Sequence, residues 1–231
     1  MGPYPKITSR GIKETVLNFY TPMTSDMNHR YKSWEHCYSY FGRPINKIDC
    51  EYASLHLAFY LASWGMYRGS SGLLQKDYLI HQKVVKQIIA YKHLAGINFI
   101  HNKVDAIQEV FKLIEIVRDI YQKEIREVKV GKRKKPFVVT DTLVTKILLG
   151  TLGCTPAYDQ YFIKGMRLEG ISYSILSVSN FKKVVDFYLD NKDEINKAGQ
   201  EILNLSGITY PPMKLVDMYF WSLGSPNNLA Y

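Results

Sequence analysis

The chain has 231 residues, 46% hydrophobic and 22% charged, a balance typical of globular domains that excludes a disordered or fibrous protein. Its 30 lysines and arginines against 21 aspartates and glutamates give a formal net charge of +9, which favours polyanionic partners such as nucleic acid. The three cysteines form no CxxC pair, which argues against a disulfide framework and indicates a reducing compartment.

The sequence carries no pattern of a secretion signal or a membrane span. The charges of residues 1–10 are not followed by an apolar run, so a signal peptide is not expected. The most apolar stretch, residues 53–66, is shorter than the roughly 20 residues that cross a hydrocarbon core. We therefore expect a cytoplasmic protein without a membrane partner.

The N-terminal part of the chain has helical periodicity, and alternating strand patterns are nearly absent from the whole sequence. Two short helices rich in aromatic residues are expected over residues 12–19 and 31–41. Asp49 can cap a third helix, which runs to about Met66 and is apolar on nearly every side. This third helix is therefore expected at the centre of the fold.

Two further helical segments follow. Residues 77–94 carry an apolar stripe that ends at Gly96. The longest amphipathic stripe begins near Asn102 and reaches Val128, which predicts a long helix on the surface.

The most basic stretch of the chain is residues 129–135, KVGKRKK, with five positive charges in seven positions. Pro136 follows it and excludes a helix interior, so a loop is expected. This basic loop is the expected boundary between lobes 1–128 and 136–231 of one compact unit. Its positive side chains would contact phosphates, and the alternative is a solvated linker: Lys129, Lys132, Arg133, Lys134 and Lys135.

Helical patterns continue to the end of the chain. Thr140 or Asp141 can cap a helix that reaches Leu152 and stops at Gly153. Further helices are expected over residues 159–168, 179–189 and 192–205, and from Pro211 onward.

The last of these helices is apolar on nearly every side, so it has to be enclosed by other helices or by a partner chain. Asp217 stands within it. A buried aspartate of this kind is expected to accept a hydrogen bond from a backbone amide or to pair with a lysine or arginine. Taken together, the elements predict an all-α protein, a two-lobed helical bundle.

The most informative passage for function is residues 139–170, where a buried helix ends in glycine and Asp159 opens the next helix after a short turn. The exposed amides and the dipole of a helix N-terminus stabilise a carboxylate there and fix its direction. Asp159 is therefore a candidate catalytic acid, and the alternative is a plain N-cap.

This passage resembles the core of the helix-hairpin-helix DNA glycosylase superfamily, in which a Leu-rich helix ends in Gly and a Pro-containing turn leads to a catalytic Asp. It is most similar to short bacterial proteins with an oxoguanine-glycosylase-like fold, where a Thr-Lys pair like Thr145-Lys146 precedes the Asp. The N-terminal lobe of these bacterial proteins has a tryptophan-glycine turn followed by Arg and Gly. This turn resembles, more weakly, four residues of the present chain: Trp64, Gly65, Arg68 and Gly69. The stronger match covers Thr145, Leu148, Leu149, Gly153, Pro156, Asp159 and the basic Arg167.

The resemblance implies a two-lobed glycosylase fold and hydrolysis of the N-glycosidic bond of a modified base that is rotated out of duplex DNA. Asp159 would stabilise positive charge on the sugar and orient or deprotonate the attacking water. Thr142 falls where lyase-competent members carry their Schiff-base lysine, so a monofunctional reaction is expected unless Lys146 substitutes.

Other residues are expected to contribute to binding of nucleic acid, DNA rather than RNA. Arg68 and Ser70, in the segment RGSSG, could cradle an anion, or form only a turn between helices. Tyr158 could stack on an extruded base, or pack its ring and donate its hydroxyl. A non-enzymatic helical module that binds nucleic acid or protein is the alternative function.

Metal chemistry is not expected, because the six histidines form no HxxxH or HExxH pair and no cysteine pair accompanies them. We predict no metal site and no cofactor.

Overall fold

The structure, a computed structural model, describes residues 11–68, 72–130 and 132–226. Over these residues it consists of ten α-helices, four short 3-10 helices and one two-stranded sheet, so the all-α prediction is confirmed. The α-helices are α1 (Ile12–Ser25), α2 (Lys32–Gly42), α3 (Cys50–Ser63), α4 (Gln82–Ala90), α5 (Lys103–Glu124), α6 (Asp141–Thr151), α7 (Gln160–Leu168), α8 (Val178–Asp190), α9 (Lys192–Ser206) and α10 (Pro212–Gly224). The 3-10 helices are η1 (Ile45–Lys47), η2 (Gly72–Gln75), η3 (Tyr78–His81) and η4 (Lys92–Leu94).

Capping residues set several of these helix ends where the sequence predicts them. The Asp49 carboxylate accepts the backbone N–H groups of Glu51 and Tyr52, both at 2.9 Å, and starts α3. The Thr140 hydroxyl accepts the N–H of Leu143 at 3.2 Å and starts α6. Gly153 ends that region with a φ of +62°, a left-handed conformation that glycine adopts without a steric penalty.

The basic stretch is an antiparallel hairpin, so the prediction of a loop there is wrong. Helix α5 ends at Glu124, before the predicted Val128, and strands β1 (Glu127–Val130) and β2 (Arg133–Pro136) follow. The Val128 side chain is half-buried, and a Cβ built on Gly72 would lie 3.1 Å from its Cγ1. The base of the hairpin therefore packs closely on η2, which a local pattern of charges does not reveal.

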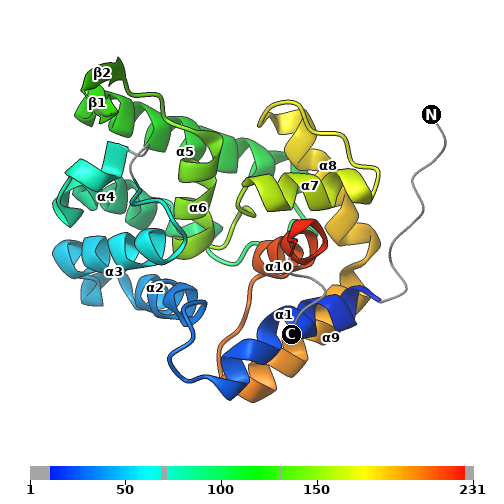
Figure 1. The fold of residues 1–231 in the computed structure, drawn as a ribbon. Helices are drawn as coiled ribbons and strands as arrows, with labels where there is room; N and C mark the ends of the chain where they lie inside the picture. The colour runs from blue at the N-terminus through cyan, green and yellow to red at the C-terminus, as the bar shows by residue number, and fades with distance from the viewer. Residues whose placement is uncertain (1–10, 69–71, 131, 227–231) are drawn as a thin grey trace.

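The helices form two packing groups, which also touch each other where α5 contacts α8 (Figure 1). In the first group, α3 contacts α2, α4 and α6, and α5 contacts α4 and α6. In the second group, α10 contacts α1, α7, α8 and α9. The predicted lobes, 1–128 and 136–231, do not match these groups, because α1 joins the C-terminal helices and α6 joins the N-terminal ones. One continuous cluster of buried side chains runs through both groups.

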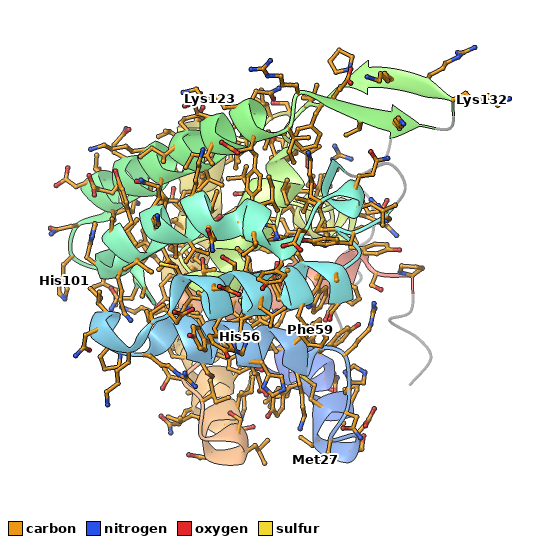
Figure 2. The ribbon with its side chains drawn as sticks, turned by 90° about the vertical axis from the view of Figure 1, so that its left-hand side faces the viewer. Met27, His56, Phe59, His101, Lys123 and Lys132 are labelled. Atoms are coloured by element: carbon orange, nitrogen blue, oxygen red, sulfur yellow. The ribbon has the colours of Figure 1, made fainter. Side chains whose placement is uncertain are left out.

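Helix α3 is not central, although its sequence is apolar on nearly every side. Ala53, Leu57 and Leu61 are fully buried, whereas Tyr52 and Phe59 on the opposite side are 64% and 57% exposed. Figure 2 looks onto this side of the helix and labels Phe59. A helix with apolar residues all round gives no direction for burial, and here the neighbouring helices cover only one side. None of the described helices combines the length and apolarity that a membrane crossing requires.

A buried histidine links two elements of the first group. His81 is fully buried, with Nε2 2.8 Å from the hydroxyl of Tyr67 and Nδ1 hydrogen-bonded to the hydroxyl of Tyr121. Burial lowers the pKa of His81 from 6.5 to about 3.

Because the unfolded chain binds a proton at His81 that the folded chain excludes, stability should fall as the pH is lowered from about 6.5 to about 3, and this contribution is complete above that window. Replacing His81 with Gln should flatten the dependence. Urea unfolding of both proteins across the window measures this difference, and an equal loss of stability in the variant would contradict it.

Candidate functional site

Asp159 uses its two carboxylate oxygens differently. Oδ1 accepts the N–H groups of Tyr161 at 3.0 Å and Phe162 at 3.1 Å, so the capping role at the start of α7 is confirmed. Oδ2 takes no part in the cap and lies 3.4 Å from Nζ of Lys146. One oxygen fixes the direction of the carboxylate, and the other remains directed at a second charged group.

Lys146 comes from the middle of α6 and joins the two packing groups. Its Nζ also donates to the carbonyl oxygen of Trp64 at 3.1 Å. The side chains of Lys146 and Asp159 are only 8% and 13% exposed, so water screens this ion pair poorly.

A second lysine–aspartate pair lies on α10. Nζ of Lys214 is 3.2 Å from Oδ2 of Asp217, and Oδ1 of Asp217 accepts the N–H of Ala157 at 2.9 Å. Both partners predicted for a buried Asp217, a backbone amide and a cation, are therefore present. Since Ala157 is two residues before Asp159, this hydrogen bond also holds the turn that carries the first pair.

Burial affects the two members of the second pair in opposite directions. It lowers the pKa of Lys214, while the carboxylate of Asp217 opposes this shift. It raises the pKa of Asp217, while the ammonium of Lys214 and the N–H of Ala157 oppose it. The negative charge of Asp159 favours the protonated form of both groups. It therefore acts to raise both pKa values, against the effect of burial for Lys214 and together with it for Asp217. The two pairs thus form one electrostatic cluster.

Both pairs border a cavity of about 10 Å³, which is room for about one water molecule. It lies at the boundary of the packing groups, because α3 and α6 supply one wall and α10 and the turn before α7 supply the other. This cavity is too small for a nucleobase. Its lining residues are Tyr60, Trp64, Lys146, Leu149, Ala157, Asp159, Lys214, Asp217 and Trp221.

Aromatic rings surround this cluster of charges. Tyr31 is stacked between Phe19 and Trp64, at centroid distances of 4.9 and 4.8 Å and interplanar angles of 12° and 19°. Trp221 stands edge-on to Phe19 and Trp64, at 88° and 86°. Nζ of Lys214 lies 5.2 Å from the ring centroid of Phe19 and 5.4 Å from that of Trp64, within cation–π range.

Tyr158 does not face solvent, so its predicted role as a surface that stacks on a base is wrong for this structure. The residue is 1% exposed, and its ring packs against Phe162 and Tyr173. Its hydroxyl has no hydrogen-bond partner among the described residues. Thr142 donates its hydroxyl to the carbonyl oxygen of Tyr158 at 2.8 Å.

The other predicted binding residues lie away from the cavity. Arg167 is exposed in the last turn of α7, about 12 Å along the helix axis from Asp159. Arg68 is exposed, and Ser70 lies outside the described residues. The side chains of the basic hairpin are exposed, but none of them lines the cavity: Lys129, Lys132, Arg133, Lys134 and Lys135.

The hairpin projects beyond α5, with Lys132 next to its turn in Figure 2. Lys134 forms an ion pair with Glu127 on the paired strand. Among the described groups no carboxylate pairs with Lys132, Arg133 or Lys135.

The sequence analysis did not identify Lys214 or most of the aromatic rings around the two ion pairs. Lys214 stands three residues before Asp217 in an otherwise apolar helix, and this i,i+3 spacing of opposite charges was the available signal. Tyr31, Trp64 and Trp221 are far apart in sequence, so only the fold brings them together.

Over the described residues, no group of three histidine, cysteine, aspartate or glutamate side chains is arranged to hold a metal ion. No protein-family model, curated protein or solved structure matches the chain, so its role has to be argued from its own residues.

Proposed function

We propose that this protein binds duplex DNA and hydrolyses the N-glycosidic bond of a modified base, with Asp159 as the catalytic carboxylate. The observation that carries the proposal is that the two oxygens of that carboxylate make different contacts. One oxygen is fixed by the helix N-terminus, and the other is held against Lys146 at a cavity between two groups of helices. The likeness of residues 139–170 to the glycosylase core supports the same reaction.

In this reaction the bond between the anomeric carbon and the base breaks, and positive charge develops on the sugar. The electron pair leaves with the base, which takes up a proton from solvent, and the oxygen of water bonds to the anomeric carbon. The Asp159 carboxylate stabilises this charge and accepts a proton from the attacking water. The cavity has room for about one water molecule beside Oδ2 of Asp159, a suitable place for the nucleophile. Lys146 fixes the direction of the carboxylate, because it pairs with the oxygen that the helix cap leaves free.

Binding of an extruded nucleotide requires this region to open, since a base does not fit into about 10 Å³. The cavity lies between the two packing groups, so a change in their separation or in the aromatic wall gives access without unfolding either group. Unstacking the base from the duplex costs a few kcal/mol, least for a damaged or mismatched base.

Replacing Asp159 with Asn should lower the single-turnover rate of base removal by about 100-fold or more. The folded variant should keep its DNA affinity, because asparagine caps a helix about as well as aspartate. Its stability should fall, because Lys146 loses its charged partner. The rate is measured as alkali-labile breaks in duplex oligonucleotides that each carry one modified base, and the affinity as fluorescence anisotropy of the same duplexes. Equal rates for the variant and the wild-type protein would contradict the role of Asp159.

Borohydride reduction separates the monofunctional mechanism from a lyase reaction. Hydrolysis by water leaves no imine, so the proposal predicts no covalent complex with substrate or abasic DNA in the presence of borohydride. A complex that forms in the wild-type protein and disappears in Lys146→Met would contradict the monofunctional version and assign the nucleophile to Lys146.

A second candidate function, binding of nucleic acid without catalysis, is favoured by the exposed hairpin. A two-stranded ribbon fits the major groove of B-DNA, and its positive side chains would contact phosphates.

Reversing the charges of Lys132, Arg133 and Lys135 to Glu should weaken duplex binding and lower the slope of log K against log salt by about 0.9 for each lost phosphate contact. The matched control also reverses three exposed lysines, which lie on α7 and α9 of the second packing group: Lys164, Lys192 and Lys197. If the two sets of variants lose the same affinity, the hairpin is not the binding surface.

A further inference from the structure

The ring of Tyr31 fills a slot between two other aromatic rings. Phe19 on α1 and Trp64 at the end of α3 lie on opposite faces of it, nearly parallel to it, at 12° and 19°. Parallel rings on both faces are the arrangement in which proteins hold a planar guest by stacking. The slot therefore has the shape of a site for a flat ring, and a side chain of the same chain occupies it.

The surroundings of this slot contain more polar groups than packing requires. Trp64 borders both the slot and the charged cavity, as does Trp221, which stands edge-on to Tyr31 at 81°. Nε1 of Trp64 is buried and has no hydrogen-bond partner among the described groups. Buried charges and an unpaired N–H each lower stability, so their presence at one place points to a ligand.

Tyr31 is half-buried and belongs to the segment between two helices. It precedes α2 in the turn after α1, whereas Phe19 is within a helix and is 6% exposed. Met27 in the same turn is 76% exposed, and Figure 2 labels it at one end of the molecule. The exposed Arg30 lies across the faces of Tyr31 and Trp64, at 5.2 and 5.9 Å. Displacement of the Tyr31 ring would free the slot.

We propose that Tyr31 is a placeholder in a binding slot for a planar aromatic ring, and that the ligand binds between Phe19 and Trp64 by displacing Tyr31. The identity of the ligand as a nucleobase rests on the proposed function, but the slot itself does not. If the slot is empty in only a small fraction of the molecules, the measured affinity is reduced by that fraction. Removing the placeholder should therefore increase the affinity for a free base.

Titration with free 2-aminopurine, a fluorescent planar base that is quenched on stacking, tests this inference. Tyr31→Ala should bind at least about tenfold more tightly than the wild-type protein, because the slot no longer has to be vacated. Tyr31→Phe keeps the ring that fills the slot and should not reproduce the gain in affinity of Tyr31→Ala. Tyr52→Ala, which removes a tyrosine that is 64% exposed on α3, is the control for a general effect of the truncation. An equal or weaker affinity of folded Tyr31→Ala would overturn the proposal.

A second measurement serves if Tyr31→Ala does not fold. In the wild-type protein labelled with 3-fluorotyrosine, the fluorine signal of Tyr31, assigned with Tyr31→Phe, should lose its ring-current shift as the base is added. A signal that stays unchanged at saturating base would overturn displacement. If Tyr31→Ala binds the base while the wild type and Asp159→Asn both fail to release bases from DNA, the slot stands and the hydrolase proposal fails. If the wild-type protein releases bases but Tyr31→Ala gains no affinity for the free base, the hydrolase proposal stands and the slot proposal fails.

Discussion

Replacing Asp217 with Ala is expected to lower the free energy of unfolding by about 3–5 kcal/mol, because it leaves the ammonium of Lys214 buried without its carboxylate. Lys214 and Asp217 are 2% and 4% exposed, so water cannot substitute for the lost partner. The N–H of Ala157 also loses its acceptor, which adds to the cost. Urea unfolding at neutral pH measures the difference.

The matched control removes both charges. Lys214→Met combined with Asp217→Asn keeps an acceptor for Ala157 and leaves no unpaired charge, so it should be clearly more stable than Asp217→Ala. A loss below about 1 kcal/mol in Asp217→Ala would mean that Lys214 finds another partner or loses its proton at little cost.

Replacing Gly165 with Ala should destabilise the protein by about 3 kcal/mol or more, at or above the upper end of overpacking costs. A Cβ at Gly165 on α7 would lie 1.9 Å from the carbonyl oxygen of Phe220 on α10. A Cβ at Gly224 would lie 1.9 Å from the carbonyl oxygen of Tyr161. Backbone atoms cannot rotate away as a side chain can, so α7 and α10 would have to separate.

Because Asp159 caps α7 and α10 carries Lys214, that separation should also disturb the site. Gly42→Ala in α2 is the control, since a Cβ there meets no atom within 4 Å and it should change stability little. Thermal unfolding of the two variants compares them. A Gly165→Ala variant as stable as Gly42→Ala would show that the two helices can adjust at little cost.

Much of the fold could be predicted because its signals are local. Caps such as Asp49, Thr140 and Asp159 act within three residues of their own position, so the sequence alone indicates where those helices start. The acid at the start of α7 is identified for the same reason, whereas Lys146 is singled out only through the Thr-Lys pair of the resemblance. Asp217 was noticeable because a charge in an apolar helix needs a partner.

Features that depend on contacts between distant segments could not be predicted. The hairpin strands have four residues each, too few for a strand pattern to be recognised among the lysines. Nothing in the sequence of α3 indicates which side its neighbours cover. The assignment of α1 to the C-terminal helices and of α6 to the N-terminal ones is a property of tertiary packing. The convergence of two ion pairs and several aromatic rings on one cavity follows from that packing.

The most direct test of the central claim identifies the chemical product. Duplex DNA that has been oxidised, alkylated or deaminated is incubated with the wild-type protein or with Asp159→Asn, and the released small molecules are analysed by mass spectrometry. The account predicts that the wild-type protein releases at least one modified base as the free base and that Asp159→Asn, although bound to the same DNA, releases it far more slowly. No free base from any of these DNAs with the wild-type protein, or equal release by both proteins, would contradict it.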